Sequence, residues 1–303
     1  MKRMLISFLA LTMAVFLLAG AAEPVFAEGS APVAENLELK TYRNVSVGGA
    51  LSAYDPDGDA VSFEITTEPV KGSIELKEDG SFVYTPRENK RGRDYFGYKA
   101  VDSEGNYSQE ATVIIKIEKQ KKDVSYSDME GRADEYAAIE LSESGLFTGE
   151  QIGQSYCFYP DKAVSRGEFL AMCMILSDEP VLTGVLSTGY ADDESIPGWM
   201  KNYVATAAMC GIEKGKLAEE GTVFDADSPI SRAEAAAILD RALNLTQVSY
   251  ISLDESLDAG LAQSCANLSA YGIMDADAFI ENALTRSEAA KMLSAALAIT
   301  AAK

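Results

Sequence analysis

One four-residue pattern with chemical potential occurs three times in the chain. A hydroxyl residue is followed by an arginine, a small residue and a glutamate at residues 165–168, 231–234 and 285–288. A guanidinium group presents several N–H donors in a fixed fork, which suits a carboxylate or a phosphate. We therefore expect the three motif arginines to bind an anionic ligand. They are Arg166, Arg232 and Arg286.

The same pattern predicts the elements that position these arginines. A Ser or Thr followed three residues later by Glu is a capping box, and each copy precedes an apolar, alanine-rich run. Each copy therefore predicts a helix start, with its hydroxyl residue and glutamate as caps. The first N–H groups of a helix have no intrahelical partner, so we expect them to bind the anion together with the arginine.

A simpler interpretation is that the motif arginines are only solvated groups beside ordinary caps. The distribution of arginine favours the ligand-binding interpretation, because only five arginines follow Tyr126 and three of them lie in the motifs. The chain is acidic, with a formal net charge of -21, which makes three equivalent cationic positions unlikely to arise by chance. The same acidic balance argues against nucleic acid as a partner.

The composition also limits catalysis. The chain contains no histidine, which excludes Ser-His-Asp triads, Cys-His dyads and histidine-ligated metal sites. Carboxylate chemistry remains open, but the Asp and Glu residues are scattered over turns and polar faces. We therefore expect a protein that is not an enzyme.

The first 27 residues predict export. Two basic residues precede an apolar run, and small residues stand at the end of the segment, as in a secretory signal peptide covering residues 1–27. No later stretch is long and apolar enough to span a bilayer, so no membrane contact is expected after cleavage.

Residues 32–118 predict a small all-β domain. Short segments alternate apolar and polar residues and are separated by turn signals, which is typical of an antiparallel sandwich. The acidic turn at residues 55–59 and the segment at residues 98–102 resemble those of immunoglobulin-like or cadherin-like modules of bacterial surface proteins.

The acidic turn leaves two alternatives open. Asp55, Asp57 and Asp59, with Asp102 from a neighbouring loop, could supply oxygen ligands to calcium. The preferred interpretation is a tight turn that is held by bonds between side chains and backbone, because Asp and Gly form such turns without a metal. No other cofactor is expected.

Residues 119–124 predict a charged linker, and a helical period with internal repetition follows it. Each repeat consists of an apolar helix, a glycine, a loop and a capped helix. The glycines Gly145, Gly211 and Gly272 are expected to end the first helices, and contact with the ligand is a secondary interpretation. The predicted repeats cover residues 125–181, 187–246 and 248–300.

The repeats resemble S-layer homology repeats. The resemblance rests on openings such as Tyr126-Ser127-Asp128 and Tyr190-Ala191-Asp192, on Gly-Ile helix ends, on Phe158-Tyr159-Pro160 and on the three motifs. It implies an all-α, three-fold pseudo-symmetric body that binds a pyruvylated secondary cell-wall polysaccharide through the motif arginines. Trp199 matches the family's helix tryptophan and is a secondary candidate ligand residue.

The resemblance implies a secreted protein that is anchored without a covalent bond to the surface of a Gram-positive-type wall. Self-association in a surface layer is compatible with it. The alternatives are a surface enzyme acting on glycans or an adhesin that the repeats target to the wall. The cysteines Cys157, Cys173, Cys210 and Cys265 could pair in an exported protein, but Cys173 stands at the position of Leu239 and Leu293, which indicates a core residue.

Overall fold

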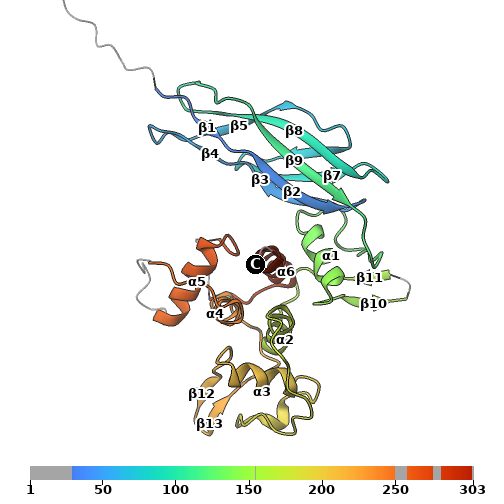
Figure 1. Ribbon diagram of the computed structural model, residues 1–303, viewed down its shortest axis with the longest axis vertical. Helices are drawn as coiled ribbons and strands as arrows, with labels where there is room; N and C mark the ends of the chain where they lie inside the picture. The colour runs from blue at the N-terminus through green and yellow to red at the C-terminus, as the bar shows by residue number, and fades with distance from the viewer. Residues whose placement is uncertain (1–28, 154, 250–257, 276–280, 302–303) are drawn as a thin grey trace, which may run out of the picture.

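The computed structural model describes residues 29–153, 155–249, 258–275 and 281–301. An N-terminal β-domain and a C-terminal helical domain lie one above the other (Figure 1). The predicted all-β region and the helical region that follows it are both present. The predicted signal peptide, residues 1–27, lies outside the described residues.

The β-domain contains one four-stranded and one three-stranded sheet. The larger sheet has the order β2-β9-β8-β5, in which β2 and β9 are parallel, and the smaller has the order β3-β7-β6. The short strands β1 and β4 pair at one end. The bounds are β1 Val33–Ala34, β2 Leu37–Tyr42, β3 Val47–Ala50, β4 Ala53–Tyr54, β5 Ser62–Thr67, β6 Gly72–Leu76, β7 Ser81–Pro86, β8 Gly92–Val101 and β9 Ala111–Glu118.

Alternation along the strands places the apolar side chains between the two sheets. In β9 every second residue is buried, from Ala111 through Val113 and Ile115 to Ile117. These residues share one core with aromatic side chains such as Phe82 of β7, in the other sheet, and Phe96 of the neighbouring strand β8. The two-residue period in the sequence therefore corresponds to a half-buried strand.

The helical domain consists of three units. The first two units each contain a helix, a short β-hairpin and a second helix, and the third has two described helices. The bounds are α1 Glu135–Ser144, β10 Glu150–Ile152, β11 Ser155–Cys157 and α2 Arg166–Leu176 in unit 1; η1 Asp193–Ser195, α3 Lys201–Met209, β12 Lys216–Ala218, β13 Gly221–Val223 and α4 Arg232–Leu243 in unit 2; and α5 Ala259–Ala270 and α6 Arg286–Ala301 in unit 3.

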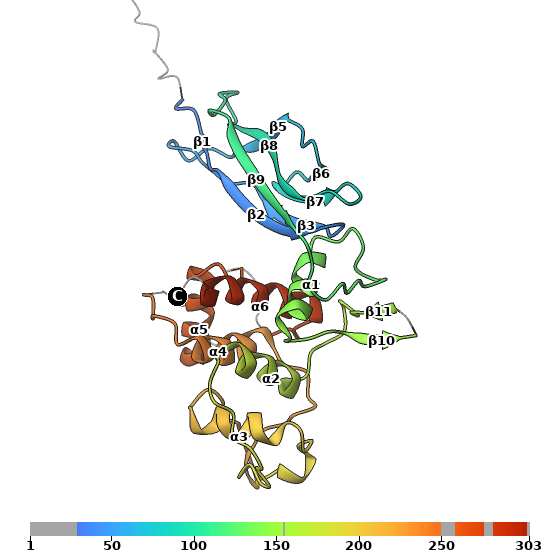
Figure 2. The ribbon, with the colours of Figure 1, turned by 45° about the vertical axis from the view of Figure 1, so that its right-hand side comes forward.

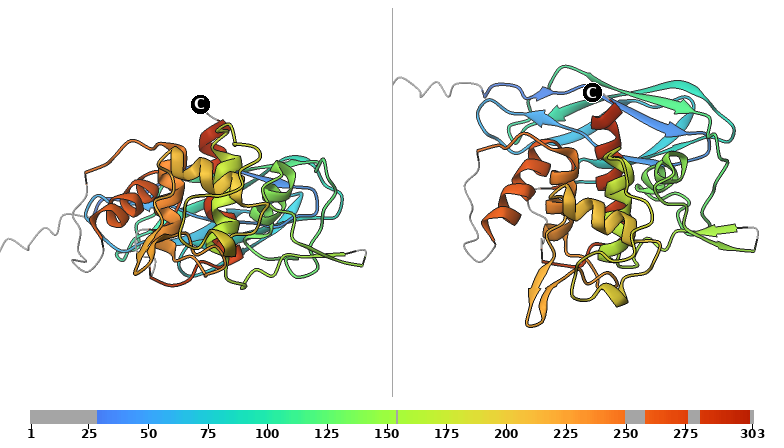
Figure 3. Two further views of the ribbon diagram at one scale, coloured as in Figure 1. Left: turned by 90° about the horizontal axis from the view of Figure 1, so that it is seen from below. Right: turned by 60° about the horizontal axis from the view of Figure 1, so that its bottom comes forward.

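The units interlock in a cycle. The first helix of each unit packs on the second helix of another unit: α3 on α2, α5 on α4 and α1 on α6. The second helices α2, α4 and α6 meet near the centre, with α3 below α2 and with α1 and α5 to either side (Figures 1 and 2). Views from below show the same arrangement under the β-domain (Figure 3). No unit could bury its apolar faces alone.

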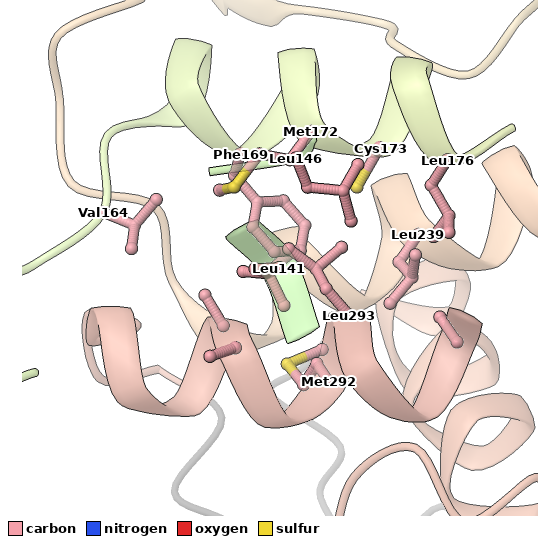
Figure 4. Packing of buried hydrophobic residues seen from close by; sticks show 14 of the residues in the cluster. Leu141, Leu146, Val164, Phe169, Met172, Cys173, Leu176, Leu239, Met292 and Leu293 are labelled. Atoms are coloured by element: carbon pink, nitrogen blue, oxygen red, sulfur yellow. The ribbon is translucent and has the colours of Figure 1, made fainter. Parts of the chain in front are cut away.

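The centre of the helical domain is closely packed. Cys173 of α2, Leu239 of α4 and Leu293 of α6 are each 0% exposed and occupy the same position in their helices. Figure 4 shows Leu293 of α6 facing Cys173 and Met172 of α2 across this core. The prediction that Cys173 is a core residue is confirmed, and all four cysteines are free.

The two domains are joined by more than the connecting segment. Tyr42 of β2 stacks on Tyr136 of α1 with ring centroids 5.4 Å apart. The backbone N–H of Ser46 donates to the buried carboxylate of Glu135 at 2.9 Å. Within residues 119–124 the N–H groups of two lysines donate to Glu143 at the end of α1. The predicted linker is therefore attached to the helical domain.

Candidate functional site

All three predicted capping boxes are present. The hydroxyls of Ser165 and Ser231 accept from the N–H of the glutamate three residues later, and each glutamate accepts from the backbone N–H of its cap residue. Thr285 and Glu288 make the same pair of bonds at 3.3 and 2.9 Å. The capped helices α2, α4 and α6 therefore begin at the motif arginines, as the sequence predicted.

The expected role of the helix-start amides is wrong. The N–H of Arg166 donates to Ser228 O at 2.9 Å, and that of Arg286 donates to Lys162 O at 2.8 Å. The N–H of Arg232 donates to Asn282 O at 3.1 Å. These amides are bonded to the backbone of another unit and cannot also bind an anion. Any ligand must therefore meet the arginine side chains.

The same bonds fix where each arginine lies. In every case the arginine amide donates to a loop that belongs to the next unit in the cycle, and unit 1 follows unit 3. The residues just before the motifs, Val164, Ile230 and Leu284, close a ring of three backbone hydrogen bonds of 2.8 to 3.0 Å. Each motif arginine is thereby held at a boundary between two units.

At the first boundary, Arg166 is sealed by two acids of unit 2. Its Nη2 donates to Glu213 Oε1 at 2.7 Å, and its Nη1 lies 3.3 Å from Glu234 Oε1. Arg166 is 6% exposed and Glu213 is 2% exposed. Three buried atoms there, Arg166 Nε and Nη1 and Glu213 Oε2, have no hydrogen-bond partner within the residues the structure describes. The first boundary is a closed polar cluster.

At the second boundary, Arg232 Nη2 donates to Glu288 Oε1 of unit 3. The Arg232 side chain is 17% exposed and that of Glu288 is 31% exposed, so this pair is more open than the first. The cap glutamates Glu234 and Glu288 thus have two roles. One oxygen caps the glutamate's own helix, and the other meets the arginine of the preceding unit.

At the third boundary, Arg286 meets an exposed acid and two aromatic rings of unit 1. Its Nη2 donates to Glu150 Oε1 and its Nη1 to Phe158 O, both at 3.1 Å. Its guanidinium carbon lies 4.9 Å from the ring centroid of Phe147 and 6.0 Å from that of Tyr159. A small, mainly apolar cavity of about 10 Å³ adjoins Arg286, which is room for roughly one water and too little for a sugar.

The electrostatics follow from these contacts. Burial alone would raise the pKa of Glu234, but bonds from Lys216 and Ser231 and the charge of Arg166 outweigh it and hold that pKa below its ordinary value. Burial is likewise outweighed at Glu288, whose pKa is lowered by bonds from Thr285 and Arg232. Both carboxyls are therefore charged at neutral pH, and each boundary already pairs a cation with an acid.

The three predicted helix-ending glycines adopt the expected geometry. Gly145, Gly211 and Gly272 have φ values of 83°, 72° and 68°, which favour glycine. In each case the next N–H bonds back to a carbonyl five residues earlier, which completes a Schellman motif. Trp199 is 58% exposed and packs edge-on against Tyr203 of α3. Ligand contact by these four residues stays a prediction.

The acidic turn of the β-domain is organised by its own backbone. Asp55 Oδ1 accepts from the N–H groups of Asp57 and Asp59 at 2.9 and 3.2 Å. Asp57 accepts from Ser30 N–H, and Asp59 accepts from the Ser103 hydroxyl. Among the described residues there is no group of three or more acids or cysteines that could hold a metal ion. The geometry matches the tight-turn interpretation.

Sequence reasoning missed the acids that face the arginines. Glu213 and Glu150 follow a helix-ending glycine by two and five residues, but nothing in their local pattern indicates a partner in another unit. It also missed the hairpins β10-β11 and β12-β13, although glycines at their starts and turns could have indicated them.

Comparison with known proteins identifies the first domain. Residues 29–119 match the family model of the bacterial cadherin-like domain. The β-domain is cadherin-like. This match confirms the cadherin-like part of the predicted fold, and its residues correspond to the two sheets described above.

Two relatives match less than half of the chain. The chain is 30% identical to a surface-layer 125 kDa protein of Lysinibacillus sphaericus over 139 residues, 45% of this chain and 11% of that protein. It is 32% identical to exoglucanase XynX of Acetivibrio thermocellus over 133 residues, 42% of this chain and 11% of that protein.

The chain therefore spans about a tenth of the length of these two relatives. Among solved structures, the SrpA adhesin of Streptococcus sanguinis aligns with 34% of this chain and 64% of its own, at 18% identity and a TM-score of 0.26. The surface-layer relative indicates a cell-surface location. In the part of the chain that the structure describes, no helix is long and apolar enough to cross a membrane.

Proposed function

We propose that this chain is a non-enzymatic cell-surface protein whose helical domain binds an anionic, pyruvylated cell-wall polysaccharide without a covalent bond. The cadherin-like domain is displayed from the wall by this attachment. The motif arginines Arg166, Arg232 and Arg286 are the groups that face the glycan. The resemblance of the three units to S-layer homology repeats and the surface-layer relative support the proposal.

One observation carries the proposal. Every motif arginine reaches across a boundary and holds a carboxylate of the next unit. The domain thus has three cations, positioned by equivalent backbone bonds, whose partner is a carboxylate in each case. A pyruvate ketal carries the same group. The glycan carboxylate binds by replacing a protein carboxylate on the guanidinium group.

Such an exchange makes each contact weak by itself. The guanidinium trades one charged bond, worth about 1.5–3 kcal/mol, for another of the same kind. The gain comes from sites repeated along one polymer, because the first contact raises the local concentration of the second. At the closed Arg166 boundary, Nε also retains unused hydrogen-bonding capacity, since it has no hydrogen-bond partner among the residues that the structure describes.

The test is co-sedimentation of the full chain with purified walls, compared with walls stripped of their acidic polymer. The double substitution Arg232→Gln with Arg286→Gln should abolish pelleting with native walls. Arg166 is left intact because its removal would leave buried Glu213 without a cation. The matched control is Lys214→Gln with Lys291→Gln, two exposed lysines whose loss changes the net charge equally. Equal pelleting of the double variant and the control would contradict the proposal.

The non-enzymatic part of the proposal has its own measurement. The chain is incubated with wall glycan and the reducing ends that are released are counted over time. We expect no increase above the blank. A reproducible release that is lost on substitution of one pair of acids would instead support the alternative of a surface enzyme.

A further inference from the structure

The backbone N–H of the arginine makes an equivalent hydrogen bond at all three boundaries, but the side chains around the guanidinium groups differ. Unit 1 residues face Arg286, and unit 2 residues face Arg166, at matching distances from the helix-ending glycines. Two residues after that glycine stands Phe147 in unit 1 and Glu213 in unit 2. The guanidinium carbon of Arg286 therefore lies 4.9 Å from the Phe147 ring centroid. That of Arg166 lies 5.9 Å from the Phe224 ring centroid, and its Nη2 meets a buried carboxylate instead of a second ring.

At two further positions the residue at the third boundary again differs in charge or ring character from its counterpart at the first boundary. Tyr159 of unit 1 stands where unit 2 has Asp225, and both residues hold a left-handed backbone with φ of 55° and 62°. In each unit an aspartate, Asp128 or Asp192, accepts from the N–H of this residue. Lys162 stands where unit 2 has Ser228. The third boundary therefore has a second aromatic ring and a lysine where the first has an acid and a hydroxyl. The lysine of the first boundary, Lys216, instead pairs with the cap glutamate Glu234.

The second cation shares its partner with Arg286. Lys162 Nζ donates to Glu150 Oε1 at 3.1 Å, and Arg286 Nη2 donates to the same oxygen at 3.1 Å. One carboxylate oxygen thus lies between a guanidinium and an ammonium group. Bonds from Lys162 and then from Arg286 lower the pKa of Glu150, so this carboxylate is charged at neutral pH.

Glu150 is much more exposed than Arg286, the arginine that it pairs with. The Arg286 side chain is 6% exposed, whereas that of Glu150 is 48% exposed. Glu150 belongs to β10, whose three residues are all exposed. The cation is therefore fixed in the domain, while its acid is supplied by a surface hairpin. The helix amides play no part, since the N–H groups of Arg286 and Ser287 donate to backbone carbonyls of unit 1.

We infer that Arg286 and Lys162, with the rings of Phe147 and Tyr159, form a binding site for the carboxylate of an acidic sugar, and that Glu150 occupies this site as an internal competitor. The inference rests on the proposed function and makes the third boundary its principal site. The sugar carboxylate takes the place of Glu150 between the two cations. Tyr159, 37% exposed, presents an aromatic face to the sugar ring.

The same exchange costs more at the first boundary. Its acid is buried Glu213, which also accepts from the N–H groups of Lys214 and Gly215 at 3.0 and 2.6 Å. Displacing this carboxylate would leave those two amides without their acceptor inside the domain. Displacing Glu150 exposes an acid that is already half in solvent, so the third boundary opens at lower cost.

The test measures binding of a 4,6-pyruvylated methyl hexoside to the full chain by NMR titration, beside the wall co-sedimentation. Glu150→Gln should bind the sugar several-fold more tightly than the wild type, because the competing charge is gone. Lys162→Gln should bind it several-fold more weakly. The control is Glu219→Gln, an exposed acid near the turn of the other hairpin, which should match the wild type.

The outcomes separate the two proposals. If the wild type pellets with walls but Glu150→Gln and Glu219→Gln bind the sugar equally, the internal competitor is refuted and the proposed function stands. If Glu150→Gln gains sugar affinity but no variant pellets with walls, the proposed function fails and the carboxylate site stands. If Glu150→Gln loses affinity, or no variant binds the sugar, the inference is overturned. Melting curves of all variants verify that each is folded.

Discussion

The backbone N–H of Ile230 donates to the carbonyl oxygen of Val164 at 3.0 Å and joins unit 2 to unit 1 one residue before each helix cap. Leu284 N–H donates in turn to Ile230 O, and Val164 N–H donates to Leu284 O. All three side chains are buried. The three backbone hydrogen bonds therefore help to position the arginines, while the side chains of the same residues belong to the apolar core of the helical domain.

Because Ile230 is 0% exposed at this centre, truncating it should be costly. We expect Ile230→Ala to lower the free energy of unfolding by about 2–5 kcal/mol, through lost burial and the cavity left behind. Ile152→Ala is the matched control, since Ile152 is 55% exposed, and it should stay within about 0.5 kcal/mol of the wild type. Urea denaturation measures both, and equal midpoints would contradict a packed centre.

The buried pair of Arg166 and Glu213 makes a second prediction. Arg166→Met should destabilise the chain by about 3–5 kcal/mol, because it leaves a buried carboxylate without its cation. Adding Glu213→Gln should recover most of that loss, since glutamine is neutral and still accepts from the N–H groups of Lys214 and Gly215. Unfolding curves of the single and double variants give the coupling. Additive losses would show that the pair is not coupled.

Sequence rules predicted what is decided within a few residues. Capping boxes, Gly145 as a helix end and Cys173 as a core residue depend on local spacing, and the structure confirms them. The change from a two-residue to a helical period likewise predicted a β-domain followed by a helical one.

What meets the arginines could not be predicted in that way. Their acidic partners lie 47, 56 and 136 residues away, and contact depends on which unit follows which in the cycle. The amides at the helix starts were expected to be bare because a single helix leaves them so. In the folded chain, these amides donate hydrogen bonds to backbone carbonyls of another unit. The sequence of a single motif contains no information about that pairing.

The lowered pKa values of Glu234 and Glu288 predict how stability depends on pH. A carboxyl whose folded-state pKa lies below its ordinary value of 4.5 stabilises the fold fully above that value. The contribution is lost as the pH falls from 4.5 through the lower folded-state pKa. The free energy of unfolding should therefore decline on acidification.

The variant Glu234→Gln with Glu288→Gln isolates this effect. Glutamine keeps the capping contact but carries no charge, so the decline between pH 5 and pH 3 should be shallower than in the wild type. The control Glu194→Gln with Glu219→Gln removes two exposed acids and should retain the wild-type slope. Thermal melts across this range measure both, and identical slopes would refute the assignment.

The contact between the two domains gives the last prediction. A Cβ atom at Gly48 of β3 would lie 2.7 Å from Ala133 Cβ and 2.9 Å from Ala133 O, just before α1. The Gly48 N–H donates to that same carbonyl at 2.8 Å, so the two backbones cannot separate without losing the bond. Gly48→Ala should cost about 1–3 kcal/mol and weaken the junction. Gly198→Ala is the control, because nothing lies within 4 Å of its added Cβ. Calorimetry should show the two domains of Gly48→Ala unfolding at more widely separated temperatures than those of the control. If both variants instead unfold in a single shared transition, the contact of Gly48 with Ala133 is not what couples the two domains.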